Sequence, residues 1–450
     1  MLQSIVIKKL FGRFDYKLDF SENRIMIITG PNGYGKSTIL KMINSFCSDD
    51  FSKLLSYAFS KFIVNCKTNK IEITKSEKCF MINKHSFPYP KTGKNTTQKD
   101  SSINSYEQYM SFLLNETFKT LTLDYEKKDF MEKNFSSNSK FNIFISNLID
   151  NTFSGLNNEK VFKKKLADIK DAFTQLSVIK QEIGSVHFIQ EQRLIEKREI
   201  GNGKGLLSRE PEIKYVSVIN ENSDKLKMEL ADFMKRHSSL SSNLDSSYIK
   251  RLFAENSGNM TVSEFRSQLH TLQKKQEKLK KYGLADIDTV SYITKLDQKR
   301  LDRFSAELTI FLEDANAKYA VFEPIIDKLD LYEQIVNQKL TFKKIHLSST
   351  NGIMIISDEG TNLSLNDLSS GEQEILVLFY KLIFESDVNL LLIDEPEISL
   401  HIAWQKELLD DFQNVVNINP KMQMIIATHS PQIISNNWDL QVDLGDQYNG

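Results

Sequence analysis

The stretch from Gly30 to Ser37 has the residue types and the spacing needed to bind phosphate groups. Its letters, GPNGYGKS, fit the pattern G-x-x-x-x-G-K-[ST]. Glycines carry no Cβ and let the backbone pass close to an anion, and the amides that begin a helix point toward that anion. Lys36 can then reach the outer phosphates of a nucleotide, and Ser37 can hold Mg²⁺. The motif therefore predicts a nucleotide phosphate site, or P-loop.

The residues around this motif predict the elements that such a site needs. Residues 24–29, RIMIIT, are typical of a buried strand, and residues 37–43, STILKMI, are typical of the beginning of a helix. A glycine-rich turn that matched by chance would not need these neighbours. The residues expected to contact the phosphates are Gly30, Asn32, Gly33, Gly35, Lys36, Ser37 and Thr38.

A second apolar run, residues 388–393, ends in two carboxylates, Asp394 and Glu395. Buried parallel strands have this composition, and ligands gather at their carboxyl ends. Asp394 is placed to join the Mg²⁺ shell, and Glu395 is the candidate base for the attacking water. An acidic turn after a strand is the simpler alternative, and the phosphate motif argues against it.

Two more segments could complete an anion site. Residues 368–373, LSSGEQ, precede an apolar helix, so Ser369 and the amide of Gly371 could bind an anion at the start of that helix. Residues 424–430, MIIATHS, read as a strand that ends in His429, whose ring could donate a hydrogen bond to a γ-phosphate. Taken singly, each has a structural alternative, a helix cap or a structural histidine.

The order of these four segments resembles that of the ABC-class ATPases. In that class the signature helix of one subunit closes over the nucleotide on the P-loop of another. The resemblance implies that Ser369 and Gly371 act in trans, that the working unit is at least a dimer, and that ATP and Mg²⁺ are the cofactors. Ser370 stands where a glycine is more usual, a change that the non-transporter branches tolerate.

The resemblance also implies a glutamine that senses Mg²⁺ between the P-loop and the signature. Residues 186–194, VHFIQEQRL, read as a short strand running into glutamine and arginine. Gln192 is the preferred candidate and Gln190 the second, and an ordinary polar strand end is the alternative. The candidates for stacking on adenine are Phe11, Phe14 and Tyr16, which the core of the first sheet would explain equally well.

The composition limits the classes of protein to which the chain could belong. The chain has 450 residues, with 58 Lys and Arg against 59 Asp and Glu, a net charge of −1. No overall basic field favours nonspecific nucleic-acid binding. The three cysteines are not paired in C-x-x-C motifs, which indicates a reducing compartment and argues against a zinc module. Neither a secretory signal nor an uncharged apolar run of about 18 residues is evident. We therefore expect a cytoplasmic protein without a membrane partner.

The fold expected is α/β, an ABC-type P-loop ATPase split by a long insertion, with a short helical coiled-coil-like arm. Residues 341–348 and 353–357 predict a β-hairpin around Asn351 and Gly352, and Pro324 predicts a helix start or a kink. Our expected segments are 1–50 and 341–450 for the two halves of the ATPase domain, 51–185 for a mixed insertion, 186–212 for the glutamine strand and a glycine-rich loop, and 213–340 for the arm.

A heptad-like seam runs through the expected arm. Its members are Leu301, Phe304, Leu308, Phe311, Ala315, Tyr319 and Phe322. Steps of three or four residues are typical of a coiled-coil contact, although an amphipathic helix facing a globular core has the same pattern. The lysines at 274, 275, 278, 280 and 281 end another expected helix. A solvated face explains them better than a DNA contact does.

A closer resemblance comes from motifs near both ends of the chain. The matching segments are residues 11–16 (FGRFDY), 30–38, 368–373, 394–401 (DEPEISLH), 428–434 (THSPQII) and 438–440 (WDL). Together they resemble bacterial anti-phage ATPases, a group that includes AriA of PARIS systems and PtuA of Septu and retron systems. Those ATPases form nucleotide-bound oligomers that hold a separate nuclease, a Toprim protein for AriA and an HNH protein for PtuA.

The resemblance implies a slow ATPase that acts as a switch and an oligomeric scaffold in anti-phage defence. The AriA-like form is the first expectation and the PtuA-like form the second, with a phage protein or DNA as the trigger. Because little chain follows His429, we expect any nuclease chemistry to come from another polypeptide. The alternative is a DNA-repair ATPase of the RecF or SMC type that binds DNA directly.

Overall fold

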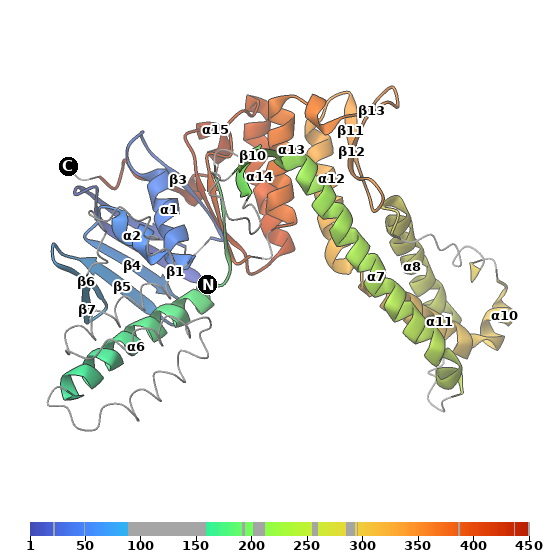
Figure 1. Cartoon of the computed structure of the whole chain (residues 1–450). Helices are drawn as coiled ribbons and strands as arrows, with labels where there is room; N and C mark the ends of the chain where they lie inside the picture. Colours follow the sequence, from blue (N-terminus) through green and yellow to red (C-terminus); the bar gives the residue numbers. More distant parts are fainter. Residues whose placement is uncertain are drawn as a thin grey trace, which may run out of the picture. The chain divides into compact units, whose positions relative to one another are not determined.

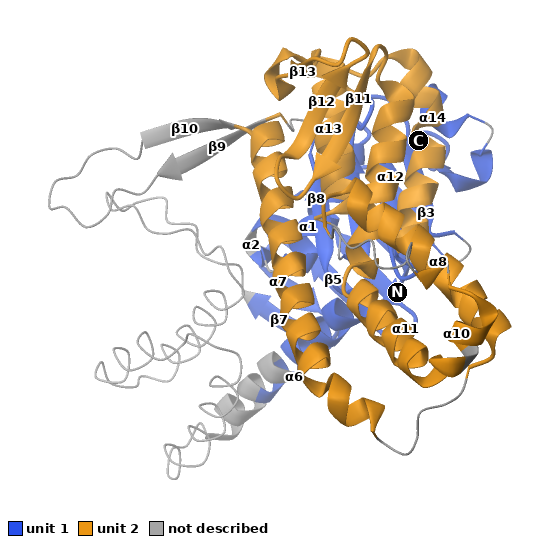
Figure 2. Cartoon of the chain, turned by 90° about the vertical axis from the view of Figure 1, so that its right-hand side faces the viewer, with its two compact units in different colours: residues 1–191, 387–397, 419–450 blue, residues 192–386, 398–418 orange. Residues whose placement is uncertain are grey.

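The computed structural model describes most of the chain outside a long stretch that begins at residue 89. The residues described are 1–20, 23–48, 50–88, 159–190, 194–200, 212–253, 260–284, 293–294, 296–385, 388–435 and 437–448. The chain divides into two compact units (Figure 2). Unit 1 comprises residues 1–191, 387–397 and 419–450, and unit 2 comprises residues 192–386 and 398–418.

Unit 1 contains a parallel sheet whose strands come from distant parts of the chain. Its order is β16-β3-β15-β14-β8. The bounds are Gln441–Asp443 for β16, Ile25–Thr29 for β3, Gln423–Ala427 for β15, Leu390–Asp394 for β14 and Val186–Ile189 for β8. The three central strands are buried along their whole length, as expected of strands covered on both faces. Helix α1, Lys36–Cys47, packs against β14, β15 and β8.

An antiparallel sheet forms the other layer of unit 1, in the order β2-β1-β4-β5-β6-β7. The bounds are Leu2–Leu10 for β1, Phe14–Asp19 for β2, Lys61–Cys66 for β4, Lys70–Lys75 for β5, Cys79–Ile82 for β6 and His85–Pro88 for β7. Helices α2 (Phe51–Ser56), α6 (Glu159–Ile183) and α15 (Pro431–Ile434) and the 3₁₀ turn η2 (Trp438–Leu440) complete the unit. Buried side chains from β1, β2, α1 and β14 share one apolar core, so the two sheets support each other.

Unit 2 is mainly helical. Its helices near the signature segment are α12 (Glu323–Lys339), α13 (Ser370–Ile383) and α14 (Ile402–Ile418). Strands β11 (Lys343–Ser348), β12 (Gly352–Ser357) and β13 (Asn362–Leu363) form an antiparallel sheet, preceding the 3₁₀ turn η1 (Leu365–Asp367), and strands β9 (Ile195–Ile200) and β10 (Glu212–Ser217) form a second ladder. The hairpin pairs Ser348 with Gly352, so the predicted turn is confirmed.

The remaining described helices of unit 2 are α7, α8, α10 and α11, which we call the arm helices (Figure 1). Their bounds are Val218–Leu252, Val262–Lys281, Gln298–Arg303 and Ser305–Ala320. Helix α11 packs on both α7 and α8. The expected α/β fold with a short helical arm is thus confirmed. Among the helices that the structure describes, none is long and apolar enough to cross a membrane.

Candidate functional site

The carboxyl ends of three parallel strands, β3, β15 and β14, lie side by side in unit 1. Across the register, Ile28 pairs with Ala427, and Ala427 pairs with Asp394. The residues that follow these strands therefore meet at one edge of the sheet, which is where open α/β sheets bind ligands. This arrangement brings together the phosphate motif, the strand-end carboxylates and His429.

The P-loop has the backbone conformation that only glycine adopts without strain. Gly30, Gly33 and Gly35 have φ angles of 137°, 85° and 94°. A Cβ on Gly35 would lie 2.9 Å from Leu10 and 3.1 Å from Phe11. A side chain at Gly35 is therefore excluded by packing as well as by conformation, whereas Gly33 faces open space on the side where a Cβ would lie. The loop leaves room beside its backbone, as a phosphate cradle must.

Lys36 is the first residue of α1 and is buried. Its Nζ donates to the carbonyl oxygen of Gly30 at 2.8 Å and lies 3.1 Å from Nδ1 of His429. Burial lowers the pKa of the Lys36 ammonium, an effect that the nearby carboxylates of Glu395 and Asp394 oppose. The amine is thus held over the loop by contacts that phosphate oxygens could replace.

Ser37 and Asp394 form the part of the site suited to Mg²⁺. The Ser37 hydroxyl donates to Oδ1 of Asp394 at 2.8 Å, and Asp394 is buried at the end of β14. A hydroxyl and a carboxylate are ligands that Mg²⁺ accepts, and it commonly uses one or two protein oxygens with phosphates and waters. Within the described ranges no cluster of three or more His, Cys, Asp or Glu residues could hold a metal. The donor set therefore fits Mg²⁺ bound together with a nucleotide.

His429 connects Lys36 to Glu395. Its Nε2 lies 3.1 Å from Oε1 of Glu395, while its Nδ1 faces the Lys36 ammonium. An ammonium group has no acceptor, so Nδ1 must accept and the proton of the neutral ring must be on Nε2, where it donates to Glu395. Burial, together with the charge of Lys36, lowers the pKa of His429, which favours this neutral form.

Glu395 lies in an unusual environment. Burial, reinforced by the neighbouring Glu397 carboxylate, raises its pKa to about 7. Its φ angle is 49°, a left-handed conformation that is costly for a residue other than glycine. The backbone amide is held there by a hydrogen bond to the carbonyl of Ala427 at 2.9 Å. A perturbed carboxyl group in a strained, fixed position is typical of a proton-accepting residue.

Glu397 organises the histidine loop, a role that sequence reasoning did not assign. Its Oε1 accepts hydrogen bonds from the hydroxyl of Thr428, from the amide of His429 at 2.9 Å and from the amide of Ser430 at 3.1 Å. In the sequence, the only indication of this role was a third carboxylate in residues 394–397 (DEPE). A surface turn explains such an acidic run equally well. Glu397 thus ties the segment after β14 to the segment after β15.

The signature residues lie in unit 2, at the beginning of α13. Ser369 is the N-cap, and its hydroxyl and the Glu372 carboxylate form a capping box, with the Ser369 amide donating to Glu372 at 2.9 Å. Lys343 binds the other carboxylate oxygen of Glu372 at 3.0 Å. A Cβ on Gly371 would lie 2.7 Å from the Ser399 carbonyl oxygen. The helix start is therefore capped and closely packed on the 398–400 segment, and Ser369 itself is exposed.

The remaining site candidates lie in several places. Gln192 is outside the described residues, and the second candidate, Gln190, is exposed just after β8. Asn32 is exposed in the P-loop, and Thr38 lies in the first turn of α1. The roles that the sequence suggests for these four residues therefore stay predictions.

A hollow of about 350 Å³ adjoins the P-loop, and two of the three candidates for stacking on adenine, Phe11 and Phe14, line it. Its lining residues are Phe11, Arg13, Phe14, Asn32, Gly33 and Tyr34. Tyr16 is buried, and its hydroxyl donates to the Tyr34 carbonyl at 2.9 Å, so it belongs to the core. The Phe14 ring packs against Tyr34 and Tyr448 at centroid distances of 5.0 and 5.1 Å. Sequence reasoning missed Tyr34 because it occupies a variable position of the motif.

The fold and this site define the class, which is a P-loop nucleoside triphosphatase of the α/β type. Residues 1–434 match the AAA_15 family, described as an AAA ATPase domain. The chain belongs to this family of ATPases. No curated protein matches its sequence.

Several solved structures of SMC heads are similar to the chain. One is the Smc head domain from Pyrococcus furiosus with an extended coiled coil, bound to the C-terminal domain of ScpA, with 12% identity, a TM-score of 0.36, and coverage of 97% of this chain and 91% of that one. A second is the SmcHead bound to the C-winged helix domain of ScpA, with 10% identity, a TM-score of 0.35 and the same coverage. A third, the SMC head domain from Thermotoga maritima, has 15% identity and a TM-score of 0.19, and covers 23% of this chain and 38% of that one.

Proposed function

We propose that the chain hydrolyses ATP with Glu395 as the base, in a site that a second copy completes. The observation that carries the proposal is the linked arrangement of Lys36, His429 and Glu395 at the P-loop, beside the Ser37–Asp394 pair. Each group has the chemistry that phosphoryl transfer to water requires, and all of them lie at the carboxyl edge of one sheet.

The roles follow from the hydrogen-bonding capacity of each group. Mg²⁺, when bound with ATP at Ser37 and Asp394, would neutralise charge on the phosphates. Lys36 donates to phosphate oxygens in place of the Gly30 carbonyl and His429. Glu395 orients the attacking water and accepts its proton. His429, once released from Lys36, can turn its Nε2–H from Glu395 to an oxygen of the γ-phosphate.

The signature residues complete the site from a neighbouring copy. Ser369 and Gly371 lie at an exposed helix start, where backbone amides and the hydroxyl can bind an anion. The capping box and Lys343 fix that surface before any nucleotide arrives. Closure on ATP and release after hydrolysis would make the protein a switch whose state depends on the nucleotide. Slow turnover suits such a switch. We place the protein in the cytoplasm.

The process we assign to this switch is anti-phage defence. The sequence motifs that resemble AriA and PtuA support the proposal, as does the presence of a helical arm in unit 2. In this role the ATP-bound oligomer holds a separately encoded nuclease, of the Toprim type first and the HNH type second, and releases it when a phage protein or DNA is sensed.

Purification from the native host, with the neighbouring genes present, tests this role. The tagged chain should retain a nuclease in a fixed ratio when ATP is present, and the mass of the complex should correspond to several copies. The Lys36→Ala variant should lose that nuclease. A dimer that instead carries DNA or recombination proteins would contradict the defence role and favour DNA repair, without affecting the assignment as an ATPase.

A further inference from the structure

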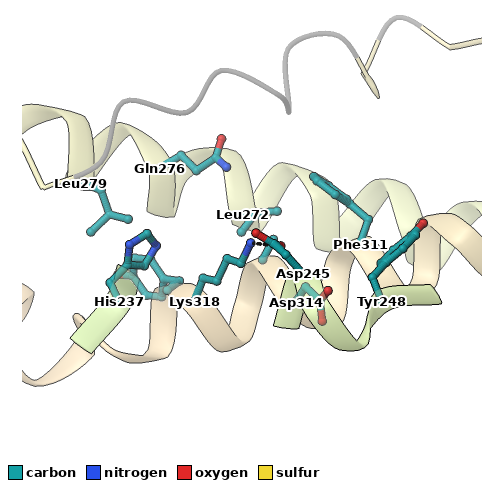
Figure 3. Close-up of a pocket in the computed structure, with 11 residues that line it drawn as sticks. His237, Asp245, Tyr248, Leu272, Gln276, Leu279, Phe311, Asp314 and Lys318 are labelled. Atoms are coloured by element: carbon teal, nitrogen blue, oxygen red, sulfur yellow. Dashed lines mark hydrogen bonds and ion pairs between the residues drawn. The ribbon is translucent and has the colours of Figure 1, made fainter. Parts of the chain in front are cut away.

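A cavity of about 190 Å³ lies among α7, α8 and α11, and all of its lining residues belong to unit 2 (Figure 3). Protein interiors are close-packed, and voids larger than a water molecule are few. For comparison, an apolar cavity of about 150 Å³ can hold benzene. The arm cavity therefore has the volume of a small organic ligand.

The cavity lies where the apolar seams of three helices are interrupted. In α8 the seam residues Phe265, Leu269, Leu272 and Leu279 are buried, and the remaining heptad position is Gln276. In α11 the seam residues Phe311 and Tyr319 flank Ala315, the smallest member. In α7, His237 occupies the position between Phe233 and Leu240. Gln276, Ala315 and His237 all line the cavity.

One polar residue in a seam often sets the register of a coiled coil. Setting the register does not need three such positions, Gln276, Ala315 and His237, to meet at one cavity. Replacement of Ala315 by leucine would fill much of the space with an ordinary seam residue. The sequence instead keeps a small side chain there, between two aromatic residues.

The walls indicate the chemistry of the ligand. Leu272, Leu279 and Tyr319 are buried apolar or aromatic side chains, and Phe311 and Tyr248 project into the same space (Figure 3). Such walls accept a flat ring, because aromatic side chains pack favourably against another ring by stacking or by edge-to-face contact. An aromatic ligand is therefore favoured over a hydrated polar one.

The charged groups of the cavity are already paired. Lys318 binds Asp245 at 3.0 Å, and Asp314 accepts two hydrogen bonds from Arg251, at 2.5 and 2.7 Å. A charged ligand would lose its hydration without gaining an unpaired counter-charge. Neutral ligands are therefore favoured over anions and cations.

The side chains of His237 and Gln276 are neutral polar groups that can fix the orientation of a ligand. Within the part of the chain that the structure describes, neither the His237 side chain nor the Gln276 side chain makes a hydrogen bond. The His237 ring contacts Phe322, at a centroid distance of 5.1 Å. Burial, together with the charge of Lys318, lowers the pKa of His237. Its ring nitrogens and the Gln276 amide provide both a donor and an acceptor.

We propose that the arm cavity binds a small neutral aromatic molecule that carries one hydrogen-bonding group. The ring would pack among Leu272, Phe311 and Tyr319, in the space left by Ala315. The polar group would bond to His237 or Gln276. None of these residues belongs to the nucleotide site, so ligand binding in the arm cavity does not depend on the ATPase mechanism.

Titration of the full-length protein with indole and phenol, by calorimetry and saturation-transfer NMR, tests the proposal. Both probes should bind with a Kd of about 1 mM or below, and both should raise the Tm. Benzoate and benzylammonium, which are similar to indole in size but carry charge, should bind at least about tenfold more weakly. No binding of either neutral probe, or equal binding of the charged probes, would overturn it.

Cavity variants locate the binding. Ala315→Leu should abolish binding of indole, whereas Ala320→Leu, the same change at an exposed position of the same helix, should leave it unchanged. Gln276→Leu should weaken indole binding and spare benzene binding, which keeps the test decisive if Ala315→Leu does not fold. Indole bound equally by wild type and by folded Ala315→Leu would place the ligand elsewhere and refute the arm cavity as its site.

Discussion

At the scale of single residues, the proposed ATPase site contains one chain of contacts from Lys36 through His429 to Glu395. The position of the ring proton follows from Lys36, which can only donate. Glu395 therefore receives a hydrogen bond from His429, and its raised pKa keeps it close to protonation near neutral pH. Binding of phosphate oxygens to Lys36 would free His429 and leave Glu395 facing water.

Glu395→Gln separates nucleotide binding from hydrolysis. The amide keeps the shape of the side chain but cannot accept the proton, so turnover should fall by about 10² to 10⁴, while ATP binding remains. The measurement is phosphate release alongside nucleotide affinity. Lys36→Ala is the comparison, and it should lose ATP binding itself. Normal turnover in Glu395→Gln would show that Glu395 is not the base.

Glu397→Gln tests a positioning role. The glutamine oxygen can still accept hydrogen bonds from the amides of His429 and Ser430, but without a full negative charge. We expect turnover to fall about tenfold with little change in ATP affinity. Glu397→Ala should cost more, because those donors then lose their partner. A loss of turnover explained entirely by a lower Tm would reduce Glu397 to a structural residue.

The sequence predicted a common site for the P-loop, Asp394 and His429, but not how these residues are linked. The P-loop, Asp394 and His429 each follow an apolar run, so their arrival at one sheet edge follows from parallel pairing alone. The link from Lys36 to Glu395 through His429 depends on side-chain geometry, which no spacing encodes. Glu397 was likewise visible only as part of an acidic run.

At the scale of elements, local sequence patterns predict where helices and hairpins begin and end. They predict poorly which strands pair when those strands are far apart in the chain. The hairpin at Asn351 and Gly352 and the helix beginning near Pro324 occur as predicted. Strand β16 was not foreseen, because its three residues carry no pattern and gain their place only by pairing with β3. The predicted seam from Leu301 to Phe322 is broken at Phe304, which is exposed between α10 and α11.

The contact between α8 and α12 gives the arm helices a pH-dependent stability. Asp330 of α12 accepts hydrogen bonds from Lys278 at 2.5 Å and from Tyr282 at 2.6 Å. Burial alone would raise the pKa of Asp330, but Lys278 and Tyr282 outweigh it and lower the pKa. The associated stability is therefore present above the unfolded-state pKa of about 3.9, and is lost as the pH falls through the lower folded-state value.

Asp330→Asn should remove this contribution. At pH 7 we expect a loss of the order of 1 kcal/mol in the free energy of unfolding, and the difference from wild type should shrink as the pH falls below about 4. Denaturant unfolding between pH 3 and pH 7 measures it. Asp327→Asn, at an exposed position of the same helix, is the control and should show no such pattern. A constant difference at every pH would contradict the linkage.

At the scale of the whole molecule, the question is whether the signature of unit 2 serves its own P-loop or that of another copy. Two variants, each with one of these two motifs inactivated, distinguish the two arrangements. Lys36→Ala disables the P-loop, and Ser369→Arg blocks the signature while leaving the helix intact, at a cost of about 1 kcal/mol for the lost cap. Each variant alone should be inactive in ATP hydrolysis.

Co-expression of the two variants in equal amounts gives opposite results for the two arrangements. If the signature acts in trans, a site works when an intact P-loop meets an intact neighbouring signature. Random assembly makes this happen for about a quarter of the sites, whether the assembly is a dimer or a larger ring. If it acts in cis, every chain carries one fatal defect and no activity returns. Co-expression of wild type with the Lys36→Ala, Ser369→Arg double variant is the matched control, because it should give about a quarter of full activity in trans and about a half in cis.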